Sequence, residues 1–214
     1  MTRTFDRREF IQLAGLATAG VAGVVFSSGL RGVARAAEKG RAEDFLFLQM
    51  SDLHWGFSGP PVNPDANGTL DKAIAHVNAL VRQPDFIVFT GDLTHTTDDP
   101  AERRTRLAHV RDTVGKLKVK DHRVLAGEHD ASLDRAEAYQ EFFGATRYTF
   151  DHKGVHFIAL DNVSDPTGKL GDDQIQWLRA DLAQHDKEAP IVVLTHRPLF
   201  DLAPDWDWAT SDGG

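Results

Sequence analysis

Four short apolar segments each run directly into acidic or histidine residues, and this repeated arrangement most constrains the fold. Segment 45–50 leads into SDLH, 86–90 into GDLTH, 122–126 into GEHD, and 191–194 into THRP. Amphipathic stretches of helical period separate these apolar segments, which is the pattern of an α/β fold. Strands that lie side by side in such a fold bring their carboxyl ends to one edge, where ligands bind. The sequence therefore predicts one site assembled from four strand ends.

Local capping signals place helices between the predicted strands. Thr69, Ser132 and Asp172 are each predicted to cap the start of a helix. Asp99 and Pro100 are predicted to open a further helix as N-cap and first helical residue.

The residue types at the strand ends indicate metal binding. The chain has no cysteine and ten histidines, so disulfides, zinc–thiolate sites and cysteine nucleophiles are excluded. Carboxylates together with imidazoles suit zinc, manganese or iron. One ion would not need so many ligands, whereas two ions about 3.5–4 Å apart, sharing a carboxylate, would use them.

The charge of the chain argues against nucleic acid as a partner. The formal net charge is −8, and five Arg against one Asp and one Glu give residues 1–36 a charge of +3. The remainder therefore carries −11, which would repel a phosphate backbone. A small phosphorylated substrate stays compatible with this charge if metal ions supply local positive charge.

Residues 1–36 read as an export signal. Arg7 and Arg8 stand before an apolar run from about Ile11 to Leu30, and Ala34-Arg35-Ala36 is a small-residue cleavage site. The paired arginines followed by Glu-Phe-Ile resemble the twin-arginine (Tat) signal, which exports folded proteins. Residues 37–44 are then a polar lead-in. This interpretation implies the Tat translocase as a partner and a periplasmic or otherwise extracytoplasmic location.

Two other interpretations of the N-terminus stay open: a retained membrane anchor and an ordinary N-terminal helix. The apolar run is nearly long enough to span a bilayer. Its many Gly and Ala residues make it weakly hydrophobic, however, and the cleavage site favours removal. A cleaved signal would leave no stable membrane association.

The ordered motifs resemble those of the calcineurin-like metallophosphoesterases. The family patterns D-x-H, G-D-x-x-D/H, G-N-H-D/E and a lone His after a strand stand here as DLH (52–54), GDLTH (91–95), GEHD (127–130) and LTH (194–196). The resemblance implies an α/β fold, a two-sheet αββα sandwich over residues 45–214. It also implies a hydrolase of phosphoester bonds, with a metal-bound hydroxide attacking in line.

The resemblance also implies roles for individual residues. The implied ligands are Asp52 and His54 at a first metal, Glu128 and His196 at a second, and Asp92 bridging both. His129 would orient the phosphate or protonate the leaving group, and Asp130 would fix the His129 ring. The cofactors would be two divalent or mixed-valence ions of manganese, iron or zinc.

The sequence departs from the family pattern in two places. Glu128 stands where the family usually has Asn, so the ligand is longer and anionic and cannot donate when ionised. The final G-H-x-H motif is absent after His196. We expect a fragment whose last strands are missing. The alternative is a naturally short chain with a decayed site, acting as an exported, non-catalytic binding protein.

Several further residues leave a choice between a site role and a packing role. His95 lines the site or packs beside its loop, and Asp161 with Asn162 touches the rim of the site or forms a turn. The acidic and aromatic cluster 205–208 faces the substrate or contacts the missing part. Segment 56–68 reads as a long loop at the mouth of the site. The substrate itself (monoester, diester, nucleotide or lipid) stays open.

Overall fold

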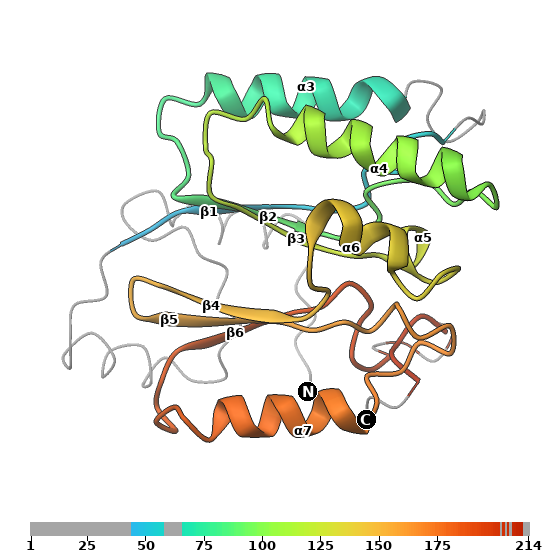
Figure 1. The fold of residues 1–214 in the computed structure, drawn as a ribbon. Helices are drawn as coiled ribbons and strands as arrows, with labels where there is room; N and C mark the ends of the chain where they lie inside the picture. The colour runs from blue at the N-terminus through green and yellow to red at the C-terminus, as the bar shows by residue number, and fades with distance from the viewer. Residues whose placement is uncertain (1–43, 58–65, 202, 204, 206, 212–214) are drawn as a thin grey trace.

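The computed structural model describes residues 44–57, 66–201, 203, 205 and 207–211 (Figure 1). The predicted export signal, most of the polar lead-in and most of the 56–68 loop lie outside these residues. The elements in chain order are β1 (Phe47–Met50), α3 (Ala66–Ala79), β2 (Phe86–Thr90), α4 (Pro100–Val114), β3 (His122–Leu125), α5 (Glu128–Ala131), α6 (Glu137–Phe143), β4 (Tyr148–His152), β5 (Val155–Ala159), α7 (Asp172–Leu182) and β6 (Ile191–Leu194).

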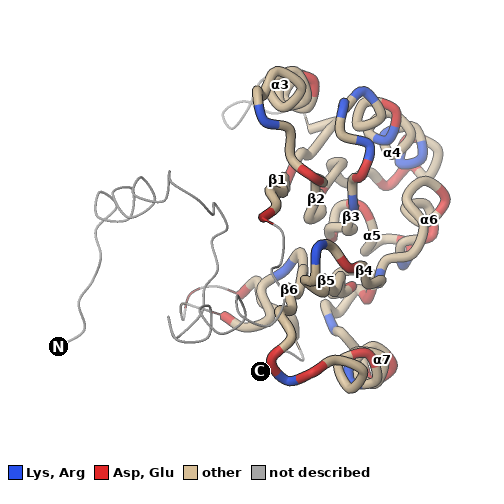
Figure 2. Tube along the Cα trace, turned by 90° about the vertical axis from the view of Figure 1, so that its left-hand side faces the viewer, with Lys and Arg blue, Asp and Glu red and all other residues tan. Residues whose placement is uncertain are grey.

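Two three-stranded sheets lie between layers of helices. The first sheet has the order β1-β2-β3 with all strands parallel, and the second has the order β4-β5-β6. In the second sheet β4 pairs antiparallel with β5, and β5 pairs parallel with β6. Helices α3 and α4 cover the outer side of the first sheet, and α7 covers the outer side of the second (Figures 1 and 2). The predicted αββα sandwich is therefore confirmed.

Strand β2 is the centre of the packing because both of its faces are buried. Ile87 and Phe89 belong to the core under the helices, whereas Phe86 and Val88 belong to the core between the sheets. Side chains alternate between faces along a strand, so one apolar run serves both cores. Between the sheets, the Phe86 ring lies 5.3 Å from that of Phe157 at 84°. Edge-to-face packing of this kind joins the two sheets.

Two of the four predicted helix starts are wrong by several residues. Helix α3 begins at Ala66, which is buried, so Thr69 lies inside the helix rather than at its cap. Ser132 ends α5 instead of starting a helix, because the GEHD motif itself forms that helical turn. Asp172 is the first residue of α7 rather than its N-cap, so this helix begins one residue earlier than predicted. Asp99 is confirmed as the N-cap of α4, where its side chain accepts hydrogen bonds from Ala101 and Glu102.

We find no helix in the described ranges with the length and apolarity needed to cross a membrane.

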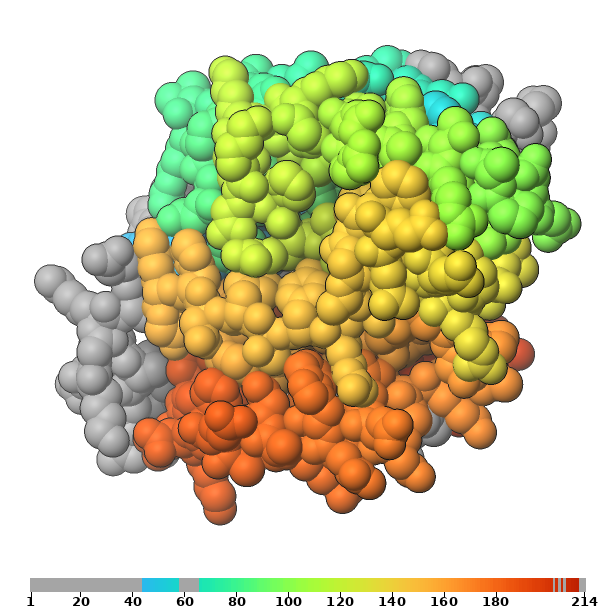
Figure 3. All heavy atoms as spheres, viewed as in Figure 1, coloured from blue at the N-terminus to red at the C-terminus, as the bar shows by residue number. Residues whose placement is uncertain are grey.

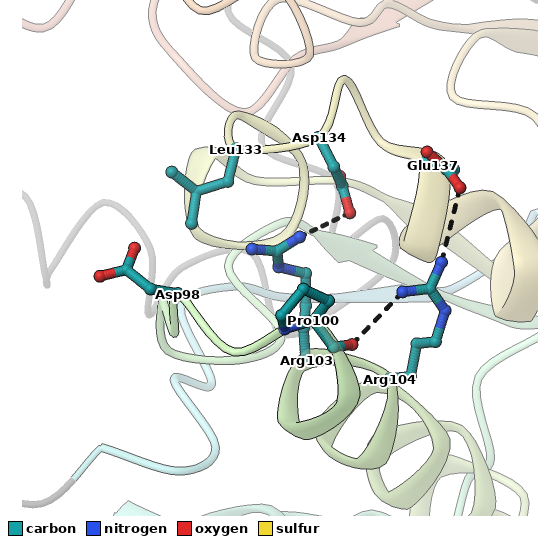
Figure 4. Close-up of a pocket in the computed structure, with 7 residues that line it drawn as sticks. All are labelled: Asp98, Pro100, Arg103, Arg104, Leu133, Asp134 and Glu137. Carbon is teal, nitrogen blue, oxygen red and sulfur yellow. Dashed lines mark hydrogen bonds and ion pairs between the residues drawn. The ribbon is translucent and has the colours of Figure 1, made fainter.

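Helices α4 and α6 pack side by side on the outer surface (Figure 3). A hollow of 460 Å³ near this contact is lined by Asp98, Pro100, Arg103, Arg104, Leu133, Asp134 and Glu137 (Figure 4). Arg103 is buried there, and its guanidinium donates to Asp134 Oδ2 at 2.7 Å and to the Thr97 carbonyl at 3.0 Å. This arginine therefore ties the loop before α4 to the segment after α5.

We expect Arg103→Met to lower the free energy of unfolding by about 3 kcal/mol, because it leaves the half-buried Asp134 carboxylate without its charged partner. The matched control is Arg104→Met, whose main partner Glu141 is exposed to solvent. That control should leave the urea midpoint unchanged within error. Equal destabilisation by the two variants, measured by urea unfolding, would contradict the clamp role of Arg103.

Candidate metal centre

The segments that follow β1 and β2 stay paired beyond the ends of the strands. The Asp52 N–H donates to the Gly91 carbonyl at 3.0 Å, and the His54 N–H donates to the Asp92 carbonyl at 2.9 Å. Asp52, His54 and Asp92 all have left-handed backbones, with φ of 59°, 44° and 50°. Residues other than Gly rarely adopt this conformation, and such strain concentrates at functional sites.

Two glycines let the ligand-bearing segments approach one another. A side chain on Gly91 would overlap the imidazole of His196, and one on Gly127 would overlap the backbone nitrogen and Oδ1 of Asp92. Gly91 also has a φ of +102°, which other residues avoid. The glycines of the GD and GEHD motifs are therefore requirements of close packing in the centre.

Asp92 lies at the middle of the cluster and is 3% exposed. Its Oδ2 lies 3.5 Å from His54 Nε2 and 3.7 Å from His129 Nε2. Its Oδ1 lies 3.6 Å from His196 Nε2 and accepts the His129 N–H at 3.0 Å. The two oxygens of one carboxylate thus face different sets of ligands, as expected of a bridging ligand.

The described residues include three overlapping groups of potential ligands whose donor atoms lie within 4.8 Å of one another. These groups are Asp52, Asp92 and His196; Asp92, Glu128 and His129; and His54, His95 and His129. Asp92 belongs to two of them. Every metal ligand predicted from the sequence is brought into this one cluster.

The orientation of His196 supports a role as a ligand. Its Nδ1–H donates to the Thr90 carbonyl at 2.7 Å, which directs Nε2 toward Glu128 Oε2 at 2.8 Å. At this distance the buried Glu128 Oε2 forms an ion pair with the protonated imidazole. Two donor atoms that converge in this way, with the second ring nitrogen held by a carbonyl, fit a shared cation.

Charge in the centre is balanced within the Glu128–His196 pair. Burial alone would lower the pKa of His196, but its contact with Glu128 and the charge of Asp92 raise it to about 9. The same contact, with Arg197 nearby, lowers the pKa of Glu128 to about 2. Burial raises the pKa of Asp92, and the protonated His196 offsets this only in part. A bound cation would supply the positive charge that this buried carboxylate lacks.

The predicted link between Asp130 and the His129 ring is wrong. Both Asp130 oxygens are used by other donors: the N–H groups of Leu93, Thr94 and Gly127 and the hydroxyl of Thr94, at 2.9–3.0 Å. Asp130 is completely buried, and burial raises its pKa to about 6. Its carboxylate therefore fastens the GEHD turn to the loop that carries Asp92.

Thr96 is the residue that hydrogen-bonds to Nδ1 of the His129 ring. Its N–H donates to His129 Nδ1 at 3.3 Å, and its hydroxyl lies close to the same nitrogen. This assignment leaves the hydrogen of a neutral ring on Nε2, which faces Asp92. Burial and the neighbouring His54 lower the pKa of His129, which favours the neutral ring.

His95 and Arg197 also lie against the centre. The His95 ring stacks on that of His129 at 4.9 Å, so His95 is part of the histidine cluster rather than of the surrounding packing. Arg197 Nε lies 3.6 Å from Glu128 Oε2. No role was predicted for Arg197 or Thr96. In the sequence, Arg197 is marked only by its position directly after the predicted ligand His196, and Thr96 only by its position beside His95.

A cavity of 590 Å³ opens onto the cluster. It is lined by Asp52, His54, Asp92, Glu128, His129, His196, Arg197, Pro198, Asp207 and Trp208. Asp207 and Trp208 come from the acidic and aromatic cluster, so these two residues face the site. Asp161 accepts hydrogen bonds from the Val163 and Ser164 N–H groups, so its side chain forms a turn.

Comparisons with known proteins agree with this geometry. A family described as calcineurin-like phosphoesterase matches residues 45–212. A probable cyclic nucleotide phosphodiesterase of Rhodococcus erythropolis is 29% identical over 77% of this chain and 56% of its own length. A cAMP/cGMP dual specificity phosphodiesterase of Mycobacterium tuberculosis is 31% identical over 77% of this chain and 53% of its own length.

The solved structure of a dimetal phosphatase from Danio rerio shares the fold. Its TM-score is 0.54 at 16% identity, with 79% of this chain and 74% of that chain covered. The chain spans little more than half the length of the two phosphodiesterases.

We expect Gly127→Ala to weaken the binding of divalent cations at least tenfold, because the added methyl group would displace Asp92. The control is Gly115→Ala, at a position with the ordinary helical φ of −57°. Equilibrium dialysis against Mn²⁺, with circular dichroism to check folding, measures the effect. A folded Gly127→Ala protein with unchanged affinity would show that the cation does not depend on the placement of Asp92.

Proposed function

The chain belongs to the calcineurin-like phosphoesterase family, and on this premise we propose that it hydrolyses phosphoester bonds at a two-metal centre. The observation that carries the proposal is the position of the buried Asp92 carboxylate, whose two oxygens face His54 on one side and His196 on the other. A shared carboxylate between two sets of ligands is the arrangement that a metal pair requires.

The residues present fit two cations. Asp52 and His54 would hold one, Glu128 and His196 the other, and Asp92 would contact both. Carboxylate and imidazole donors suit manganese, iron or zinc. When bound, such ions neutralise charge on the phosphoryl group and activate water near neutral pH.

His129 supplies a hydrogen-bond donor beside the cations. Because Thr96 occupies Nδ1, the neutral His129 ring carries its hydrogen on Nε2. The lowered pKa of His129 keeps the ring neutral, and neighbouring cations would lower it further. A neutral Nε2–H donates to a phosphoryl oxygen more readily than it releases a proton, so we assign it to orienting the phosphate.

The substrate we propose is a small phosphodiester. The two phosphodiesterases similar to this chain support this class. Trp208, which is 74% exposed, and Arg197 border the cavity, and they offer a flat apolar surface and a positive charge for the organic and anionic parts of such a molecule. The acidic charge of the body disfavours a nucleic acid.

We also propose that the protein acts outside the cytoplasm after export by the Tat translocase. The paired Arg7 and Arg8, the apolar run and the Ala34-Arg35-Ala36 site support this proposal. Export of a folded chain would allow the ions to be loaded before the protein crosses the membrane. Cleavage at that site would leave no stable attachment to the membrane.

The test of the function is Asp92→Asn. We expect this variant to lower kcat for bis-p-nitrophenyl phosphate at least 100-fold, because a neutral amide cannot bridge two cations. Asp98→Asn, at an exposed position outside the centre, should keep parental turnover. Metal content of both proteins is measured in parallel. Parental turnover in Asp92→Asn would overturn the assignment, and a folded parent without metal or turnover would favour the non-catalytic binding protein.

The role of His129 is tested with a series of phosphodiesters whose leaving groups differ in pKa. For His129→Ala we expect kcat to fall by about 10²–10³ for every substrate, because the lost donor contacts the phosphoryl group. A loss that grows steeply with the pKa of the leaving group would instead make His129 the general acid. Partial recovery in His129→Gln, which restores an N–H donor, would support orientation.

A further inference from the structure

A second cluster of potential ligands lies on the outer side of the second sheet. It consists of His156 near the start of β5, Asp181 in the last turn of α7, and His185 just after that helix. Strands β5 and β6 run parallel, so His156 lies at the opposite end of this sheet from the metal centre. In the space-filling view, α7 and the segment after it form the lower edge of the molecule (Figure 3).

The ring of His156 is held between two carboxylates. His156 is 6% exposed, its Nδ1 lies 2.7 Å from Asp151 Oδ1, and its Nε2 lies 3.0 Å from Asp181 Oδ2. The His185 ring lies 3.9 Å from it, centroid to centroid. Donor atoms of His156, Asp181 and His185 all lie within 4.8 Å of one another.

We propose that His156, Asp181 and His185 form a zinc-binding site. Two imidazoles with one carboxylate favour zinc over the oxygen-seeking calcium and magnesium. Ligands on a tetrahedral zinc at bond lengths near 2.0 Å stand about 3.3 Å apart. The 3.0 Å between His156 Nε2 and Asp181 Oδ2 is close to that separation.

Asp151 completes the arrangement as an outer partner. With Nδ1–H of His156 donating to Asp151, the Nε2 lone pair is directed at the Asp181 side of the ring. A carboxylate that orients a ligating histidine in this way is the usual outer shell of protein zinc sites. His196 in the metal centre is oriented by the same device, with the Thr90 carbonyl in place of the carboxylate.

The site would anchor a weakly held helix. Gln174 is the one buried residue of α7, and no described α7 side chain belongs to either hydrophobic core, so little apolar packing holds this helix to the sheet. Asp181 and His185 are four residues apart and lie near one another at the helix end. A zinc ion shared with His156 would join that end to β5. Without zinc, a protonated Nε2 of His156 would donate a hydrogen bond to Asp181 instead.

Zinc stoichiometry and affinity test the proposal, measured by equilibrium dialysis and elemental analysis. The variants are His54→Ala, which removes a ligand of the metal centre, His185→Ala, and the two combined. Asp181→Asn is a second variant at the proposed site that opens no space. His76→Ala, at an exposed histidine near the end of α3, is the matched control. Circular dichroism checks that each protein folds.

We expect His185→Ala and Asp181→Asn each to lose one zinc per chain or to weaken one zinc at least tenfold, with His54→Ala and His76→Ala leaving that zinc in place. Zinc should also raise the unfolding temperature of His54→Ala by more than that of the combined variant. Equal zinc binding by the parent and both folded site variants would overturn the proposal and leave the cluster an ion pair only. Loss of all bound zinc in His54→Ala would do the same, because all of the zinc would then belong to the metal centre.

Discussion

The centre depends on the buried carboxylate of Asp130 and the four hydrogen bonds that it accepts. Three of these come from Leu93 and Thr94 and one from Gly127, so a single side chain joins the loop after β2 to the turn after β3. That junction places Asp92 against the GEHD turn, where the His129 N–H donates to its Oδ1. Buried hydrogen bonds to a charged group are strong, and losing one partner leaves the others unsatisfied. The position of the loop that carries Asp92 therefore follows from an interaction made by a residue outside the predicted metal ligands.

The aromatic contact between the sheets helps to position His196, the last of the predicted metal ligands along the chain. Phe86 and Phe157 hold β2 over the second sheet, and β6 lies beside β5 in that sheet. His196 follows β6 and donates to the carbonyl of Thr90, the last residue of β2. The packing between the sheets thus also determines where His196 lies in the centre. A substitution in the aromatic core between the sheets would therefore shift His196 in the cavity.

Positive charge is the shared requirement of both clusters. In the centre Asp52, Asp92 and Glu128 converge, with His196 and Arg197 as nearby compensation. In the second cluster Asp151 and Asp181 enclose His156. The centre would bind a cation or keep a proton, because the buried Asp92 carboxylate is costly without a partner. Glu128 stands where the family usually has a neutral amide. Its negative charge raises the need for positive charge in the centre and lowers the net positive charge available to attract a substrate.

Local sequence determined the strands, the order of the motifs and the ligands that meet in the centre. An apolar run predicts its own strand, and residues at strand ends share one edge whatever the distant contacts are. Tertiary structure alone decided that Thr96 contacts His129, that Asp130 fastens two loops, and that Arg103 reaches Asp134. It also extended α3 back to the buried Ala66. These contacts join residues 31 or more positions apart or depend on burial, so no local pattern of the chain encodes them.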